Sequence, residues 1–286
     1  MLVVRPIGYK DGPRAALAGT TLLDAIGIPP DGDFALGLAI GENRVGDIPS
    51  ALASTIHMVP VDICRGGAAH DLSDPNVIDA LVRASSTGRC KLVFVCIPCN
   101  TYSAANLLPD ADGNPGKPHR VINNIRGFVQ ANGSLSAICA AHNTMADGVA
   151  EVCIAVCAQD GFFIAETAAC RREGFPDATP GCEEHAYLYD QPSWKSLAAM
   201  TNASITIYDQ CRTQNSPADA FRVGRKATAN MASEKVADIV KMEFGGLRCD
   251  HANGTHPPLR GADKHGTYRT TGTHQYSSTL CAKYAS

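Results

Sequence analysis

The sequence has no excess of positive charge, no long apolar run and no internal repeat or low-complexity tract. Its 286 residues include 25 lysines and arginines against 28 aspartates and glutamates, which gives a formal net charge of −3. Without a global basic field, any contact with nucleic acid must come from a local patch. No apolar run approaches the roughly 20 residues that a membrane helix needs. The sequence therefore predicts one large core with additions and no membrane partner.

The sequence also lacks an opening charged segment followed by an apolar one, which is the pattern of a secretory signal. Its 12 cysteines are scattered through apolar stretches rather than gathered in a short framework of disulfides. We therefore expect a reducing compartment, the nucleus or the cytoplasm. The sequons at Asn132, Asn202 and Asn253 would then be incidental.

From residue 34 onward, apolar runs of strand length alternate with helix-like segments. We expect strands over 34–41, 56–63, 91–97, 161–167, 203–211 and 244–249. We expect helices over 14–26, 45–55, 75–85, 119–131, 136–159, 193–200 and 276–285. Strands separated by helices predict an α/β fold with a mostly parallel sheet and helices on both faces. In such a fold, ligands bind beyond the carboxyl ends of the strands.

Residues 91–103, KLVFVCIPCNTYS, place Cys96 and Cys99 at C-x-x-C spacing at the end of an expected strand. A redox dithiol of the thioredoxin type would open a helix, whereas a loop rich in Asn, Asp, Gly and Pro follows here. A zinc knuckle normally needs a second pair at matching spacing, and the sequence has no second C-x-x-C. Two further interpretations are that both cysteines only pack, or that Cys99 is a nucleophile at the loop entrance. The residues alone leave these alternatives open.

Polar residues end three other expected strands. Asp62 ends one, Glu166 ends the segment FIAE, and Gln210 with Arg212 ends ITIYDQCR. Because the ends of parallel strands share one edge of a sheet, we expect these groups to lie at the same level as Cys99.

The order and spacing of these residues resemble the C5-cytosine DNA methyltransferases, and more closely the divergent methyltransferase-like domains of algal, protist and mobile-element proteins. In that family a Pro-Cys dipeptide ends the fourth strand, as Pro98-Cys99 does here. Glu166 matches the glutamate that ends the next strand. Residues 210–214, Gln-Cys-Arg-Thr-Gln, match a Gln-x-Arg-x-Arg strand except that Gln214 stands where a second arginine is common. The resemblance covers roughly residues 34–285 and implies a Rossmann-like methyltransferase fold.

The resemblance also implies a site for S-adenosylmethionine. Asp62 stands where the family's acidic residue binds the ribose hydroxyls, and Asp71 stands where one contacts the adenine amine. The residues assigned to the cofactor are Phe34, Gly37 and Gly41, which approximate the motif Phe-x-Gly-x-Gly, together with Asp62, Asp71, Leu72 and Pro98.

The implied reaction is methylation of cytosine carbon 5 in DNA or RNA. Cys99 would add to carbon 6 of a flipped base, and Glu166 would serve ring nitrogen 3. Arg212 would hold the base and stabilise the thiolate, and Gln210 would position the catalytic loop. The alternative function is a methyltransferase-fold module that has lost the reaction and serves as a binding or assembly domain of a larger protein.

The resemblance divides the chain into an N-terminal arm over 1–33, a catalytic core over 34–212, and a reduced target-recognition and C-terminal subdomain over 213–286. Arg222, Arg225 and Lys226 give the last of these a local basic patch. We expect nucleic acid as the partner, and further domains if the chain belongs to a longer polyprotein.

A second cluster lies in the segment LRCDHANGTHPP. Cys249, His251 and His256 have the side chains and the close spacing of zinc ligands, and Cys211 on the preceding strand would complete a structural site of four ligands. The alternative is that these are loop residues with unrelated roles.

Overall fold

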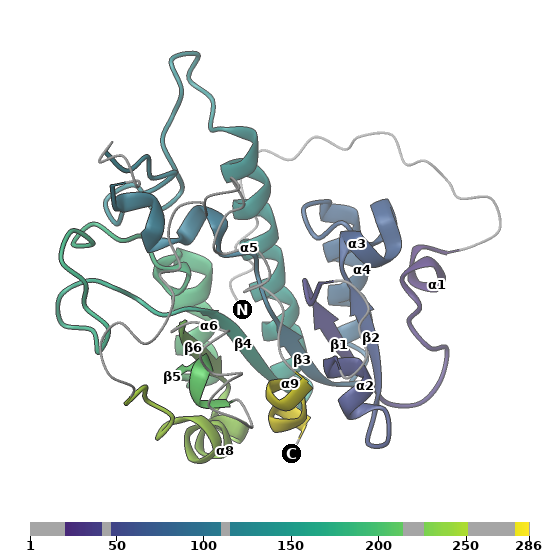
Figure 1. Ribbon diagram of the computed structural model, residues 1–286. Helices are drawn as coiled ribbons and strands as arrows, with labels where there is room; N and C mark the ends of the chain where they lie inside the picture. The colour runs from purple at the N-terminus through teal and green to yellow at the C-terminus, as the bar shows by residue number, and fades with distance from the viewer. Residues whose placement is uncertain (1–20, 42–46, 110–114, 214–225, 251–277, 286) are drawn as a thin grey trace, which may run out of the picture.

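In the computed structural model, the described residues are 21–41, 47–109, 115–213, 226–250 and 278–285 (Figure 1). They form an α/β fold around one six-stranded sheet with the order β2-β1-β3-β4-β6-β5. The strands are β1 (Phe34–Leu38), β2 (His57–Val61), β3 (Cys90–Val95), β4 (Phe162–Ala168), β5 (Ser204–Asp209) and β6 (Ala227–Ala232).

The first four strands are mutually parallel, and β6 runs antiparallel to both β4 and β5. The expectation of an α/β fold with a mostly parallel sheet is therefore confirmed. Strand β1 is buried along its whole length, as a central strand covered on both faces must be.

Helices cover both faces of the sheet (Figure 1). One face carries α4 (Pro75–Ser85), α5 (Ala137–Cys157) and α6 (Pro192–Thr201). The other carries α2 (Ile48–Leu52), α8 (Glu234–Phe244) and α9 (Ser278–Ala285). Successive side chains of a strand point to opposite faces of the sheet. In β3, Val93 and Val95 pack on the first face, and Leu92 and Phe94 pack on the second.

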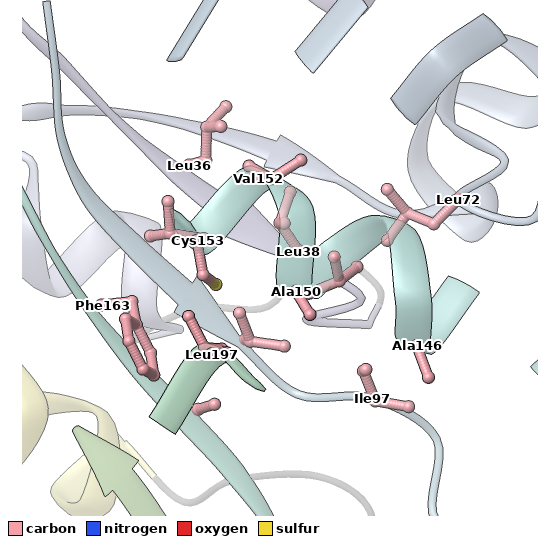
Figure 2. Packing of buried hydrophobic residues seen from close by; sticks show 14 of the residues in the cluster. Leu36, Leu38, Leu72, Ile97, Ala146, Ala150, Val152, Cys153, Phe163 and Leu197 are labelled. Carbon is pink, nitrogen blue, oxygen red and sulfur yellow. The ribbon is translucent and has the colours of Figure 1, made fainter. Parts of the chain in front are cut away.

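The core on the first face is built from strand side chains against α5 and α6. Figure 2 shows Leu36 and Leu38 of β1 close to Ala150 and Cys153 of α5, with Leu197 of α6 beside them. This packing fixes the strands whose ends carry the candidate site.

Shorter elements connect the layers. They are α1 (Leu22–Ile26), α3 (Ile63–Gly66) and the 3-10 turns η1 (Gly67–His70), η2 (Asn100–Tyr102), η3 (Ala104–Leu107), η4 (Leu188–Asp190) and η5 (Gln210–Thr213). Capping explains where α4 begins, because the Asp74 side chain accepts a hydrogen bond from Asn76 N at 2.8 Å and Pro75 occupies the first turn.

Two expected elements are wrong. Residues 119–131 are not a helix: Val121 makes antiparallel bridges with Asn124 and His185, and the buried Arg120 side chain donates to the Ile125 carbonyl at 2.8 Å. Residues 244–249 are not a strand, because α8 ends at Phe244 and a turn follows. Strand β6 and helix α8 were not expected.

The C-terminal helix α9 packs against α2. The centroids of the Tyr284 ring and the Phe94 ring of β3 lie 4.7 Å apart, so α9 packs against a central strand of the sheet. The division into arm, core and C-terminal subdomain stays a prediction. Within the described residues, no helix combines the length and the apolar character needed to cross a bilayer.

Candidate functional site

The strand order reverses between β1 and β3, which are neighbours in the sheet. The chain passes from β1 to β2 on one side and from β3 to β4 on the other, so a ligand crevice is expected at the carboxyl ends of β1 and β3. Backbone bonds hold these ends together: Cys96 N donates to Leu38 O at 3.0 Å, and Ala39 N donates to Val61 O at 2.9 Å. Residues that follow β1, β2 and β3 therefore meet at one edge.

Asp62 and Gly41 meet at this edge. One carboxylate oxygen of Asp62 accepts from Gly41 N at 2.8 Å, and the other accepts from Cys64 N at 2.9 Å and so caps α3. Arg65 donates to the Gly41 carbonyl and to buried Asp47, the latter at 2.9 Å. Gly41 has φ +77°, and a Cβ built there would meet no described atom within 4 Å. The edge thus combines a fixed carboxylate with a glycine whose missing side chain leaves space beside it.

The other residues assigned to the cofactor have different surroundings. Phe34 begins β1, at the opposite end of the strand from Gly41, and is buried in the core. Leu72 is also a buried core residue. Gly37 lies inside β1, where a Cβ would lie 2.6 Å from the Ile40 side chain, so close packing alone accounts for this glycine.

Asp71 and Pro98 lie nearer to the surface. The Asp71 carboxylate accepts from Ser73 N at 2.9 Å and from Ser73 Oγ at 2.7 Å, which fixes the turn before α4. Pro98 is exposed just beyond β3. Of the assigned set, the structure brings Gly41 and Asp62 into contact.

Cys99 occupies the open end of β3. It follows the exposed Pro98, is half-buried, and carries a free thiol. Its carbonyl accepts from Tyr102 N at 2.9 Å, so the chain turns directly into η2. Cys96 packs against the core on the α9 face. The two thiols therefore have different environments, as strand and loop positions predict.

Glu166 lies within β4 and forms a buried ion pair with Lys226. The Lys226 Nζ is 3.7 Å from the Glu166 Oε1, and the two side chains are 17% and 6% exposed. Burial disfavours the charged form of the lysine, but its pKa is nevertheless raised, because Glu166 and then Cys99 and Cys96 attract the ammonium. Lys226 therefore lies within electrostatic reach of both the predicted nucleophile and the predicted glutamate.

Two tyrosines, Tyr208 of β5 and Tyr284 of α9, extend this polar cluster. Tyr284 donates to the Asn230 side chain at 2.8 Å, and the Tyr208 and Tyr284 hydroxyls are 2.9 Å apart. Burial, together with nearby Glu166, raises the pKa of both tyrosines well above its ordinary value, so both stay neutral. Asn230 pairs with Glu166 across the β4–β6 ladder. Glu166 thus lies opposite Asn230 in the sheet and is paired with one cation.

Gln210 and Arg212 both lie in the turn η5, but their side chains have different environments. Gln210 is buried, and its backbone N donates to Lys226 O at 3.0 Å. Its side-chain Nε2 is buried without a hydrogen-bond partner within the described part of the chain. Arg212 is 37% exposed and forms an ion pair with exposed Asp250. The structure thus places the expected arginine in a surface pair, and it is Lys226 that pairs with Glu166.

A second network holds the turn that follows Cys99. Thr101 Oγ1 lies 2.9 Å from His142 Nδ1 of α5. Burial, with a contribution from Arg120, lowers the His142 pKa to about 4, so the ring is neutral at physiological pH. Tyr102 accepts from Gln191 Nε2 at 2.9 Å, and the Arg120 guanidinium stacks 4.1 Å from the Tyr102 ring. Sequence reasoning did not find this support, because no motif or spacing marks it.

The predicted zinc ligands are only partly described. Asp209 N donates to Leu247 O at 2.8 Å, and Cys249 N donates to the Asp209 carboxylate at 2.8 Å, so the segments that carry Cys211 and Cys249 lie side by side. His251 and His256 lie outside the described residues, as do Arg222 and Arg225. The residues that are described hold no group of three or more metal-binding side chains. The zinc site stays a prediction.

Compared with protein-family models, curated proteins and solved structures, the chain gives no match. The function is therefore inferred from the residues at the strand ends and from their contacts.

Proposed function

We propose that the chain is an S-adenosylmethionine-dependent methyltransferase that acts on carbon 5 of cytosine in DNA or RNA through an adduct with Cys99. One observation carries the proposal. A free thiol follows β3 at the sheet edge that also carries Asp62, and the neighbouring strand β4 carries Glu166, which is buried in an ion pair with Lys226.

The sheet supports the proposal at the level of the fold. Strand β6 is antiparallel and inserted between β4 and β5, on a sheet that otherwise runs parallel. The resemblance implies a mostly parallel sheet with helices on both faces, and the sheet agrees with it to that extent. The reversal between β1 and β3 then supplies the ligand crevice.

The residues at the edge of β1 and β2 fit the implied cofactor. Each carboxylate oxygen of Asp62 accepts one backbone hydrogen bond and can accept another, so it can still bind ribose hydroxyls. Gly41, which has no side chain, leaves space for a ligand beside it, and Asp71 would receive the adenine amine. When bound, S-adenosylmethionine supplies an electrophilic methyl group.

The side chains of the chain itself would activate the base. The Cys99 thiolate forms a bond from sulfur to carbon 6, and the electron pair of the ring double bond moves to carbon 5. Glu166 serves ring nitrogen 3 as that atom becomes protonated, and buried Gln210 positions the loop. After carbon 5 is methylated, loss of its proton and cleavage of the sulfur–carbon bond restore the aromatic base and Cys99.

One observation favours the alternative, a methyltransferase-fold module without the reaction. Glu166 is 5% exposed and paired with Lys226, so a flipped base reaches it only if the side chains that bury it move. A module that binds a partner without catalysis needs no such movement.

A measurement of cofactor binding distinguishes the methyltransferase from the module without the reaction. Wild-type protein is expected to bind S-adenosylmethionine in calorimetry, and Asp62→Ala to weaken this binding about 10- to 100-fold, because it removes charge-assisted hydrogen bonds. Asp79→Ala, at an exposed position of α4, is the matched control and should bind like wild type. If wild-type protein shows no binding at millimolar ligand, the methyltransferase proposal fails.

A further inference from the structure

Arg120 is a buried arginine, 2% exposed, whose contacts are with neutral groups. Its Nη1 donates to the Ile125 carbonyl at 2.8 Å and to the Asn143 side-chain oxygen at 2.9 Å. Its guanidinium carbon lies 4.1 Å from the centre of the Tyr102 ring. Within the described part of the chain, no carboxylate forms an ion pair with it.

The remaining donors of Arg120 lie together on one edge of the guanidinium. Nε and Nη2 are both buried, and neither has a hydrogen-bond partner among the described residues. These two nitrogens each point one N–H in the same direction, and this fork fits two oxygens of a carboxylate or a phosphate. Buried donors normally have acceptors, and a buried charge without a counter-charge is costlier still. The ligand that would satisfy the fork is therefore anionic and offers two oxygens.

The segment that carries Arg120 has no acid of its own. Residues 117–126, KPHRVINNIR, include three lysines and arginines and one histidine but no aspartate or glutamate. Arg126 is already paired, because its Nη1 donates to both carboxylate oxygens of Asp147 of α5, at 2.9 and 2.7 Å. That pair is neutral as a whole, so Asp147 does not compensate the charge of Arg120.

The surrounding contacts hold the guanidinium beside the turn that follows Cys99. Gln191 Nε2 donates to the Tyr102 hydroxyl at 2.9 Å and lies 3.3 Å from the same Asn143 oxygen that Arg120 binds. Tyr102 N in turn donates to the Cys99 carbonyl at 2.9 Å. An arginine held in this way does not have to be ordered when an anion binds.

We propose that Arg120 is the central residue of a phosphate-binding site beside the turn that follows Cys99, and that its Nε and Nη2 bind two phosphate oxygens. Because both nitrogens are buried, neighbouring loop residues must shift to admit the ligand. Phosphate is favoured over a carboxylate because it can carry two negative charges, and the same segment also carries the exposed Lys117 and His119.

The phosphate is either inorganic phosphate or a phosphate of a nucleic-acid backbone. The second assignment rests on the proposed function, whereas the site itself requires neither cofactor nor methyl transfer. The test of the site can therefore fail or succeed separately from the methyltransferase proposal.

Calorimetry with inorganic phosphate near neutral pH, at an ionic strength kept constant with chloride, tests the site. Wild-type protein is expected to show saturable binding, and acetate should bind more weakly. Arg120→Gln should weaken phosphate binding about tenfold or more, because it removes both the charge and the fork. Arg83→Gln removes an exposed arginine of α4 and is the matched control, with the affinity of wild type.

Circular dichroism identifies variants that are folded. If Arg120→Gln does not fold, Arg120→Lys takes its place; it keeps the charge but loses the fork, and should bind phosphate about fivefold more weakly than wild type. In wild-type protein, phosphate should also raise the melting temperature relative to chloride. Three results would each overturn the proposal: no saturable binding to wild type, wild-type affinity in a folded Arg120 variant, or tighter binding of acetate than of phosphate.

Competition distinguishes the two sources of phosphate. If a short single-stranded oligonucleotide displaces inorganic phosphate from wild-type protein and the matching nucleoside does not, the site binds the nucleic-acid backbone. If the oligonucleotide does not displace it, the site binds free phosphate, and its assignment to nucleic acid is wrong.

Discussion

Replacing Cys99 with alanine is expected to lower the rate of methyl transfer to cytosine-containing nucleic acid by about a thousandfold or more. The reason is that carbon 5 becomes nucleophilic only after the thiolate has added to carbon 6, and no other group replaces that covalent step. The fold should be unaffected, because Cys99 is half-buried in a loop beyond β3.

Transfer of a labelled methyl group to DNA and to RNA, measured under single-turnover conditions, tests this expectation. Cys96→Ala is the matched control: it removes the other thiol of the C-x-x-C spacing from a position that packs against the core, and should retain most of the activity. If Cys99→Ala keeps activity close to that of wild type, Cys99 is not the nucleophile.

Replacing Trp194 with alanine is expected to lower the free energy of unfolding by about 3–5 kcal/mol. Trp194 of α6 is 0% exposed and is among the largest fully buried side chains of the described chain. Its indole Nε1 donates to Ala146 O of α5 at 3.1 Å, and its ring lies 5.3 Å from that of Tyr189. Alanine would leave a cavity between the helices that support the sheet on one face.

Urea unfolding followed by circular dichroism measures this change. Trp194→Phe keeps much of the volume and loses the hydrogen bond, so it should cost markedly less than alanine. A loss well under 1 kcal/mol for Trp194→Ala would show that this packing contributes little to stability.

The central strands and the longest helices could be predicted because their patterns are local. The apolar runs at 34–41 and 91–97 contain β1 and most of β3, and residues 75–85 form α4 with its expected cap. The expected helix over 136–159 contains α5. In each case, the sequence period and the burial of the segment lead to the same assignment.

The prediction failed where distant residues decide the structure. Strand β6, ATANMA, consists largely of small side chains and has no strand pattern of its own, yet pairing with β4 and β5 buries all of it. Residues 119–131 look helical, but the buried Arg120 bonds within a turn. Helix α8 did have a signal, because Val236, Val240 and Phe244 recur at helical spacing.

The residues of the candidate site also divide into those with a local sequence signal and those whose position depends on distant residues. Cys99 and Asp62 could be located because each follows an apolar run that ends at a strand edge. The position of Lys226 could not be predicted, because it depends on the insertion of β6 beside β4. From the sequence alone, Lys226 was assigned to a local basic patch with Arg222 and Arg225. Arg212 was assigned from the resemblance, and its pair with Asp250 depends on a segment that comes later in the chain.

The most direct test of the account is covalent trapping on 5-fluorocytosine, whose fluorine cannot leave as a proton does. Wild-type protein is incubated with S-adenosylmethionine and with DNA or RNA that contains this base, and the adduct is located by peptide mass spectrometry. The account predicts that the nucleic acid remains bound to the peptide that carries Cys99, and that Cys99→Ala gives no adduct. A wild-type protein that binds S-adenosylmethionine but forms no adduct with either nucleic acid, or forms it at another residue, would contradict it.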